Sequence, residues 1–423
     1  MYDTMNFIDK NYEPKDSDLV CLFRIEPSEK ISLEKAAANV AKESSVGTWT
    51  HIGTVNERAE RIKARVFDIN EPYAKIAYPK ELFELDNVPQ ILSSIAGNIF
   101  GMKLLKNLRF EDVRFPPELL EKHRGPQVGL ENIRKLFEVE KRPLLGTIVK
   151  PKLGLGSKSH AEVAYRAWKG GLDIVKDDEN LSSMAFNTFE RRVDETMHLK
   201  EKAEKETGEH KEYMGNITAP VSEMKRRADY LIGKGSNYVM IDIVTTGWSA
   251  LQDMREYLEG KDIVIHCHRA GHAAFTRNKK HGMSMLTVAK FTRLIGGDQL
   301  HIGTAGVGKM EGDEDKVLRI QEAVESRSEN EGEIKLAQNW KDIKKTAAVA
   351  SGGLHPGDIP KLIGRMGKNI VAQFGGGCHG HPDGTEPGAR AIRQACDAVL
   401  EGQDLEKYAE KNTELKDALN KWC

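Results

Sequence analysis

The sequence has little cysteine, no long apolar run and almost no net charge. Its 423 residues include five cysteines without a C-x-x-C pair, namely Cys21, Cys267, Cys378, Cys396 and Cys423. An odd cysteine count without paired spacing argues against a disulfide framework or a structural zinc site and favours a reducing compartment. No apolar run reaches the about 18 residues of a membrane span, and residues 1–12 lack the apolar segment of a signal peptide. We therefore expect a cytoplasmic protein with no membrane partner.

The charge is balanced, with 63 basic and 64 acidic residues and a formal net charge of −1. A chain without an overall basic field does not attract nucleic acid or anionic lipid, so neither partner is expected. An anionic ligand must then be held by a local site. Hydrophobic residues make up 39% and charged residues 30%, which indicates a globular chain long enough for more than one domain.

Residues 1–135 predict a ferredoxin-like α+β domain, because strand and helix signals follow the order β-α-β-β-α-β. An apolar stripe at Leu33, Ala36, Ala37 and Val40 marks the first helix. The predicted strands span 19–25, 48–54, 65–78 (as a hairpin) and 104–115, and the helices span 32–44 and 88–100.

Residues 136–423 alternate strictly between strand and helix signals and predict a (β/α)8 TIM barrel followed by a solvated C-terminal helix. The predicted strands span 144–150, 173–176, 213–218, 238–244, 263–268, 299–303, 347–351 and 370–374, and the clearest helices span 160–168, 186–206, 222–233, 284–294 and 389–400. A doubly wound open sheet shows the same alternation and is the alternative.

The segment from Gly170 to Asn180, GGLDIVKDDEN, carries the strongest chemical signal. It runs from a buried strand into one lysine and three carboxylates, at a strand end where α/β proteins place their chemistry. Asp178 and Glu179 offer the hard oxygen ligands that Mg²⁺ prefers. A neutral Lys176 could take up CO₂ and become a third oxygen ligand. The alternative is a surface charge cluster at a strand-to-helix turn.

Other predicted strands also end in polar or glycine-rich segments. These segments are Lys150-Pro151-Lys152, Asn216, His266-Cys267-His268-Arg269, His301, Ser351-Gly352-Gly353 and Gly375-Gly376-Gly377. Glycine runs let backbone N–H groups approach an anion closely. Two such runs, with Arg269 and His301 nearby, suggest a substrate with two phosphate groups, although a glycine run can also be only a tight turn.

Two motifs suggest other activities and are weaker. Residues 303–309 fit G-x-x-x-x-G-K, but Met310 follows, which lacks the hydroxyl that a P-loop uses for Mg²⁺. A mobile lid that carries Lys309 over the site is the better interpretation. His266 and His268 form an H-x-H pair similar to that of binuclear amidohydrolases, but those enzymes carry it after the first strand rather than the fifth.

Together these segments resemble the large subunit of ribulose-1,5-bisphosphate carboxylase/oxygenase (Rubisco) over nearly the whole chain. The motifs that carry the resemblance are ESSVGTWT at 43–50, AGNIFG at 96–101, GTIVKPKLGL at 146–155, GGLDIVKDDEN at 170–180, HCHRAGH at 266–272, GTAGVGKMEG at 303–312, SGG at 351–353 and QFGGGCHGHP at 373–382. The resemblance implies that CO₂ or O₂ adds to the Mg²⁺-bound enediolate of ribulose bisphosphate, and that carboxylation gives two molecules of 3-phosphoglycerate.

The resemblance also implies a role for individual residues. A CO₂-derived carbamate on Lys176, with Asp178 and Glu179, would hold Mg²⁺. The catalytic residues would be Lys150, Lys176, His268, Lys309, Glu43 and Asn98. The substrate-binding residues would be Thr48, Trp49, Lys152, Arg269, His301, Ser351, Gly352, Gly353, Gln373, Gly375 and Gly376.

In this family the N-terminal residues reach the barrel of a partner subunit, so the resemblance implies a homodimer or a ring of dimers. The longer lid and the short N- and C-terminal segments look like the archaeal form III branch, which works without small subunits and in AMP or nucleoside salvage. A Rubisco-like enolase or isomerase acting on a thio-sugar phosphate is the nearest alternative, and a non-catalytic assembly protein is a weaker one.

Overall fold

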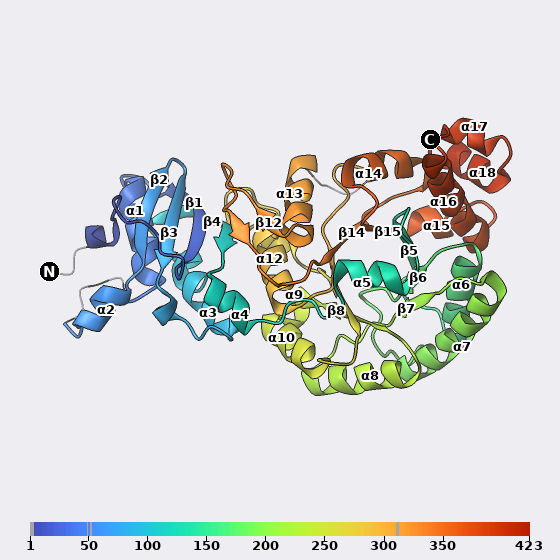
Figure 1. Ribbon diagram of the computed structural model, residues 1–423, viewed down its shortest axis with the longest axis horizontal. Helices are drawn as coiled ribbons and strands as arrows, with labels where there is room; N and C mark the ends of the chain where they lie inside the picture. The colour runs from blue at the N-terminus through green and yellow to red at the C-terminus, as the bar shows by residue number, and fades with distance from the viewer. Residues whose placement is uncertain (1–3, 49, 51–52, 310–312) are drawn as a thin grey trace. The chain divides into compact units, whose positions relative to one another are not determined.

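The computed structural model describes residues 4–48, 50, 53–309 and 313–423 (Figure 1). The chain forms two compact units. Unit 1 comprises Met1–Gly125, Gly271–Ile295 and Ser326–Ile343, and unit 2 comprises Pro126–Ala270, Gly296–Glu325 and Lys344–Cys423. Unit 1 therefore includes two segments from late in the chain, which no local pattern in the sequence indicates.

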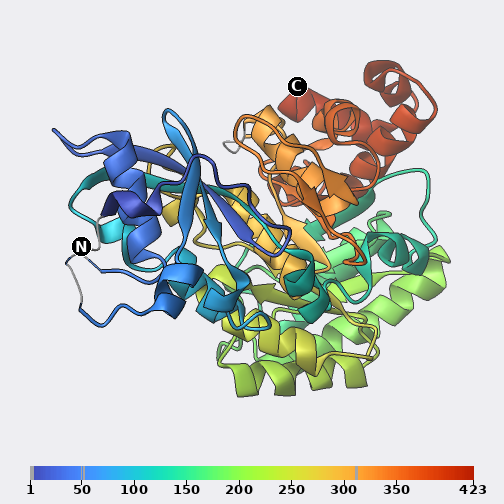
Figure 2. The same ribbon diagram turned by 60° about the vertical axis from the view of Figure 1, so that its left-hand side comes forward.

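Unit 1 contains the predicted ferredoxin-like sheet, seen in Figures 1 and 2. Its strands pair antiparallel in the order β4-β1-β3-β2, and the short β10 (Gly282–Met283) joins β4 in parallel. The main elements are β1 (Leu19–Pro27), α1 (Leu33–Glu43), β2 (Arg65–Asn70), β3 (Tyr73–Tyr78), α3 (Val88–Ile95) and β4 (Leu105–Arg114). Ser32 begins α1 by accepting a hydrogen bond from the backbone N of Lys35 at 3.2 Å. The prediction of this unit's fold is confirmed.

The predicted strand over 48–54 is wrong for its described residues, Thr48, Thr50, Gly53 and Thr54, none of which lies in a strand. Trp49, His51 and Ile52 lie outside the described residues. The helix α2 (Glu57–Ile62) follows, capped by the side chain of Asn56, which accepts from Ala59 N at 2.9 Å. Alternating β-branched residues suggested a strand, but β-propensity forms no strand without a partner to pair with.

Unit 2 is the predicted eight-stranded barrel. Its parallel sheet has the order β7-β6-β5-β15-β14-β11-β9-β8, and a parallel bridge between Asn216 and Met240 closes the ring between β7 and β8. The strands are β5 (Leu144–Ile148), β6 (Ile174–Lys176), β7 (Glu212–Met214), β8 (Tyr238–Asp242), β9 (Val264–His268), β11 (Gln299–His301), β14 (Ala347–Ser351) and β15 (Val371–Phe374).

Helices follow the strands, as a (β/α)8 barrel requires. In unit 2 they are α6 (Ser157–Lys169), α7 (Phe189–Thr207), α8 (Val221–Gly233), α10 (Trp248–Tyr257), α13 (Glu314–Glu325), α14 (Ile359–Met366) and α16 (Thr385–Leu400). Figure 1 shows α6, α7 and α8 along the outer edge of the unit. The two helices between β9 and β11, the short α11 (Ala273–Thr276) and α12 (Met285–Ile295), belong to unit 1.

The C-terminal segment is not the single solvated helix that its Lys and Glu content predicted. It forms α17 (Leu405–Ala409) and α18 (Thr413–Trp422), and Leu415 and Ala418 of α18 are buried. Gln394 of α16 accepts a hydrogen bond from Leu415 N at 3.0 Å. The apolar residues of α18 are spaced so that they form one buried stripe. The high Lys and Glu content of the segment hides this spacing.

The helix α5 (Gly129–Leu136) closes the N-terminal end of the barrel. Its Leu130 and Ile133 pack with residues from the starts of the barrel strands, namely Leu144, Ile174, Tyr238, Val264, Ala347 and Val371. The buried Asp298 accepts hydrogen bonds from the backbone N of Val128, Gly129 and Ile265 at 2.8–2.9 Å, which ties the helix to the strands. An apolar plug at one end leaves the carboxyl ends of the strands as the end available for chemistry.

Among the described residues no helix is both long and apolar enough to cross a membrane. All five cysteines are free, and all except Cys423 are buried. No two of these cysteines are joined in a disulfide in the structure.

A buried charge cluster links three segments of unit 1. Lys290 Nζ lies 2.8 Å from Asp112 Oδ1, and the other oxygen of Asp112 accepts from Leu336 N at 2.7 Å. Asp112→Asn should lower the free energy of unfolding by about 3–5 kcal/mol, because it leaves the Lys290 charge buried without its nearest partner. Urea denaturation measures this. As a control, Lys75→Met breaks the part-exposed pair with Glu331 and should cost at most about 1 kcal/mol; equal costs would contradict the prediction.

Candidate functional site

The predicted barrel-borne residues gather at the carboxyl ends of the strands of unit 2. Lys176 ends β6, His268 ends β9, His301 ends β11 and Ser351 ends β14. Lys150 lies two residues after the end of β5, and Gly375 directly follows β15. This placement follows from the fold, since parallel strands bring their carboxyl ends to the same rim of a barrel.

Lys176 lies at the centre of a cluster of lysines and acids. Its side chain is 1% exposed, and Nζ lies 3.9 Å from Glu179 Oε2. Nζ donates a hydrogen bond to the backbone oxygen of Asp177 at 2.9 Å. Lys150 Nζ donates to Asp178 Oδ2 at 2.6 Å, while Asp178 Oδ1 accepts from the side chain of Asn180 at 2.9 Å. Each acid of the predicted metal site thus lies beside a lysine.

Burial lowers the pKa of Lys176, and the charges of Glu179 and Asp178 offset only part of this effect. A lower pKa increases the fraction of neutral amine, which is the form that reacts with CO₂. For Asp178, burial raises the pKa, but the hydrogen bonds from Lys150 and Asn180 outweigh it, so the net pKa is lowered. The site therefore favours an ionised carboxylate next to an amine that loses its proton easily.

The donor chemistry of this cluster fits Mg²⁺ once Lys176 is modified. Asp178 and Glu179 provide hard oxygen donors. Within the described residues no group of three or more His, Cys, Asp or Glu side chains is arranged to hold a metal. The two carboxylates therefore need a further ligand, and the buried Lys176 next to them could provide one as a carbamate.

His268 lies beside the acid cluster and is oriented by a residue that the sequence analysis missed. This residue is Asp242, the last residue of β8, and its Oδ1 atom lies 2.8 Å from His268 Nδ1. The other ring nitrogen, Nε2, lies 3.6 Å from Glu179 Oε2. A carboxylate at one ring nitrogen fixes the orientation of the imidazole. The signal was weak, because the predicted strand ran on to residue 244 and placed Asp242 inside the strand, whereas β8 ends at this residue.

His301 lies in a buried group with His266 and Gln299. His266 Nε2 lies 2.9 Å from His301 Nε2, and His266 Nδ1 lies 2.8 Å from Gln299 Oε1. Burial lowers the pKa of both histidines well below the usual value, so they are neutral at pH 7. His266 therefore positions His301 and is part of a hydrogen-bonded chain rather than of a two-histidine metal site.

Arg269 is the cation best placed for an anion. Burial lowers its pKa to about 10, and no hydrogen-bond or ion-pair partner is found for it among the described residues. A methyl group at Gly303, after β11, would lie 3.6 Å from its Nη2, so the guanidinium lies beside the end of that strand. A half-buried guanidinium to which the described residues offer no carboxylate favours binding of an anionic ligand.

The glycine loops make close backbone approaches possible. A side chain at Gly308 would meet the backbone oxygen of Gly352 at 2.7 Å, and one at Gly353 would meet Lys309 Cβ at 2.9 Å. Lys309 N donates to Gly352 O at 3.2 Å, while the Lys309 side chain is exposed. The predicted lid therefore packs against the Ser351-Gly352-Gly353 turn. Gly375 lies against Lys150, since a methyl group there would be 3.5 Å from Lys150 Cε.

Several predicted site residues lie elsewhere or have no close partner. Lys152 is exposed, and Gln373 is buried inside the barrel with its amide nitrogen 3.9 Å from Met214 Sδ. Glu43, Thr48 and Asn98 belong to unit 1, and Trp49 lies outside the described residues.

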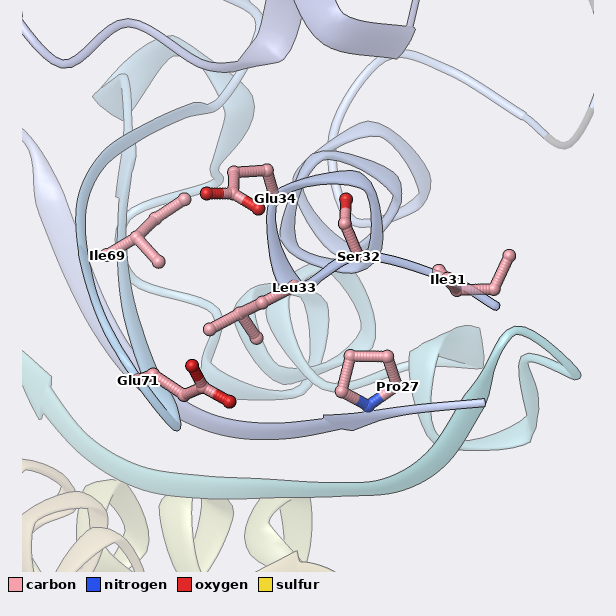
Figure 3. Close-up of a pocket in the computed structure, with 7 residues that line it drawn as sticks. All are labelled: Pro27, Ile31, Ser32, Leu33, Glu34, Ile69 and Glu71. Atoms are coloured by element: carbon pink, nitrogen blue, oxygen red, sulfur yellow. The ribbon is translucent and has the colours of Figure 1, made fainter. Parts of the chain in front are cut away.

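A shallow pocket on unit 1, shown in Figure 3, has a different character. It is lined by Pro27, Ile31, Ser32, Leu33, Glu34, Ile69 and Glu71. None of these residues was predicted as part of the site. The pocket contains two carboxylates and no cation, so it does not suit a phosphorylated ligand.

The sequence analysis did not identify the buried groups that support the loop of Asp178 and Glu179. Asp177, Arg192 and Tyr213 are buried and joined by hydrogen bonds. Arg192 comes from α7, far from the strand ends that the analysis searched. Sequence spacing gives no signal for such a contact, because it depends on how the helix packs.

Two family models match the chain, and together they include nearly all of its residues. A family model described as "Ribulose bisphosphate carboxylase large chain, catalytic domain" matches residues 129–422. A second model, for the N-terminal domain of the same large chain, matches residues 6–119.

Relatives of known name and structure match over nearly the full length. A ribulose bisphosphate carboxylase of Methanosarcina mazei is 51% identical over 99% of both chains, and that of Methanocaldococcus jannaschii is 49% identical over 99% of this chain and all of its own. The structure of a dimeric archaeal Rubisco from Hyperthermus butylicus matches with a TM-score of 0.93 at 45% identity, covering 99% of both chains. An octameric Rubisco from Pyrococcus horikoshii, in complex with sulfate, matches at 0.91 and 48%, covering 99% and 96%.

Because Arg269 has no hydrogen-bond or ion-pair partner in the described part of the chain, we predict that a small anion stabilises the protein. Sulfate should raise the melting temperature of the wild type, because a ligand that binds only the folded state adds about 2.7 kcal/mol at 100 times its Kd. Arg269→Gln should remove most of this rise, as measured by thermal unfolding against sulfate concentration. The matched control is Arg142→Gln, which removes a buried arginine already paired with Asp173. An equal loss in the control would contradict an anion site at Arg269.

Proposed function

The chain belongs to the ribulose bisphosphate carboxylase large-chain family, and on that premise we propose that it adds CO₂, or O₂ in a side reaction, to ribulose 1,5-bisphosphate. Carboxylation gives two molecules of 3-phosphoglycerate. The observation that carries the proposal is the buried Lys176, which lies next to Asp178 and Glu179 at the barrel rim. The same rim presents two glycine turns and Arg269, which has no partner among the described residues. A bisphosphate with a reactive carbon between its phosphates needs both kinds of site.

Lys176, as the carbamate formed with CO₂, would hold Mg²⁺ together with Asp178 and Glu179. When bound, the ion supplies Lewis-acid stabilisation of the sugar's oxygen atoms. The role of the protein is to keep these donors together. Lys150 supports this, since its ammonium lies 2.6 Å from Asp178 and keeps that carboxylate ionised.

The other rim residues would bind the sugar and move protons. Lys150, which contacts Asp178 at the rim, would transfer protons at the reacting carbons, and His268, oriented by Asp242, would serve the C3 hydroxyl. Lys309 would bring its charge from the lid toward the new carboxylate. Ser351 would hold a sugar hydroxyl.

Two groups of residues would bind the two phosphates. Arg269 and His301 would take one of them. The other would lie at the glycine turns, where the backbone N–H groups of Gly352, Gly353, Gly375 and Gly376 can approach it. Thr48 and Trp49 would contribute to this second phosphate, with Lys152 and Gln373 in supporting roles.

The proposal includes assembly and setting. The dimeric and octameric relatives support a homodimer or a ring of dimers. In such an assembly Glu43 and Asn98 would act on a neighbouring barrel, and we expect no small subunit. We propose that the enzyme works in AMP or nucleoside salvage, because its lid segment resembles that of the archaeal form III branch. We propose a cytoplasmic location, because the cysteine usage favours a reducing compartment.

Product identification tests the proposal. With labelled bicarbonate, Mg²⁺ and ribulose bisphosphate, the wild type should form labelled 3-phosphoglycerate. Lys176→Ala should lower the rate at least about 10³-fold, because two carboxylates alone hold Mg²⁺ weakly and the Lewis acid is lost. Lys169→Ala, on the exposed end of α6, is the control and should keep full activity. C3 proton exchange without incorporated label would instead support the enolase or isomerase alternative, and near wild-type carboxylation by Lys176→Ala would refute the metal-site assignment.

A shared site predicts complementation between inactive chains. Asn98→Ala and Lys176→Ala homodimers should each be inactive. Mixed dimers should regain up to about half of the wild-type activity per dimer, because one of their two composite sites carries no mutation. Activity is measured after subunit exchange, with native mass spectrometry to confirm heterodimers. No recovery in confirmed heterodimers would place Asn98 in the site of its own subunit.

A further inference from the structure

Asp177 lies between the proposed ligands Lys176 and Asp178 but is itself enclosed by protein. Its side chain is fully buried. Oδ1 accepts a hydrogen bond from the Tyr213 hydroxyl at 2.6 Å, and Oδ2 accepts from Arg192 Nε at 3.1 Å and from the backbone N of Asn216 at 2.9 Å. The Asp177 carboxylate therefore has its partners within the protein and leaves cation binding to its neighbours.

Arg192 extends this contact to the far end of the same loop. Its side chain is fully buried, and Nη2 donates to the backbone oxygen of Ser182 at 2.7 Å. Nη1 donates to the backbone oxygen of Asn187 at 3.1 Å. One rigid guanidinium thus joins Asp177, at the start of the loop, to Ser182 and Asn187 after the acid pair. A planar fork with several donors suits this bridging in a way that an ammonium does not.

Other contacts hold the backbone between these points. The side chain of Asn216 donates to the backbone oxygens of Glu179 at 3.2 Å and Leu181 at 3.0 Å. His160 Nε2 lies 3.1 Å from Asp177 Oδ1 on the remaining side of the carboxylate. The loop that carries Asp178 and Glu179 is therefore fixed at both ends and in its middle, while its two acids stay available for a ligand.

We propose that Asp177, Arg192 and Tyr213 form a positioning group that fixes the Asp178–Glu179 loop and thereby sets how tightly the activated site holds its divalent cation. This inference rests on the metal site proposed above. A fully buried ion pair is weak evidence of a purely stabilising role, because desolvation offsets its attraction. Residues that orient metal ligands through hydrogen bonds, by contrast, change metal affinity directly.

The same strand offers a matched comparison. At the other end of β6, Asp173 accepts two hydrogen bonds from Arg142, and Leu145 N donates to it at 2.8 Å. Both carboxylates are buried, paired with an arginine and joined to the backbone. Only Asp177 borders the proposed ligands. Variants of the Asp173–Arg142 pair should therefore lose stability alone, whereas variants of the Asp177–Arg192 pair should also lose the geometry of the ligands.

The test measures labelled CO₂ retained on Lys176 in the full assembly as Mg²⁺ is varied, a readout that does not depend on turnover. Asp177→Asn and Arg192→Lys should each raise the half-saturating Mg²⁺ concentration by at least about tenfold. Arg192→Lys keeps the charge but cannot bridge the loop, so it separates positioning from charge and gives a second variant if Asp177→Asn folds poorly. Asp173→Asn should lower thermal stability and leave the Mg²⁺ dependence unchanged.

Two results would overturn the inference. The first is an unchanged Mg²⁺ dependence in the Asp177 and Arg192 variants, and the second is an equal shift in Asp173→Asn. If the wild type retains no labelled CO₂ at any Mg²⁺ concentration, the metal site itself is refuted and this inference with it. That outcome is distinguishable, because it appears in the wild type before any variant is compared.

Discussion

Burying the amine of Lys176 is the constraint on which the rest of the site depends. A lysine that is 1% exposed is costly to keep charged, so its pKa falls and its neutral form becomes accessible. The barrel makes this burial possible, because β6 ends inside a ring of strands whose opposite end is closed by α5. If the same residue lay on an exposed turn, it would stay an ammonium and pair with its neighbouring acids as an ordinary surface cluster.

Once the amine is buried, the charges around it have to be arranged in a fixed geometry. Asp177 is compensated from within the protein by Arg192 and Tyr213, whereas Asp178 has Lys150 as its partner at the rim. This difference assigns separate tasks to two consecutive carboxylates. One is compensated by groups that cannot leave without unfolding the loop, and the other by a flexible side chain that can turn toward a ligand.

The sequence predicted most of the elements and the strand-end positions of residues such as Lys176, because both depend on local patterns. Apolar runs that end in Lys176, His268 or Ser351 mark strand ends, and parallel strands bring such ends together. The features that were not predicted depend on packing between segments far apart in the sequence. Examples are the hydrogen bond from Arg192 of α7 to Asp177 and the late segments that belong to unit 1. The expected strand at 48–54, which is wrong for its described residues, has the opposite cause, since local signals indicated a strand but none of these residues pairs with one.

The rim also separates charges that are satisfied within the protein from charges that are left for a ligand. Lys176 and Lys150 lie next to acids, so they hold the acid cluster together before anything binds. Arg269 has no such partner among the described residues, and its partial burial makes its charge costly unless an anion binds. A ligand with negative groups therefore gains most at the arginine and the glycine turns, while a cation gains most at Asp178 and Glu179. A sugar bisphosphate binding with a divalent cation would satisfy both sets of charges at once, and neither ligand alone would do so.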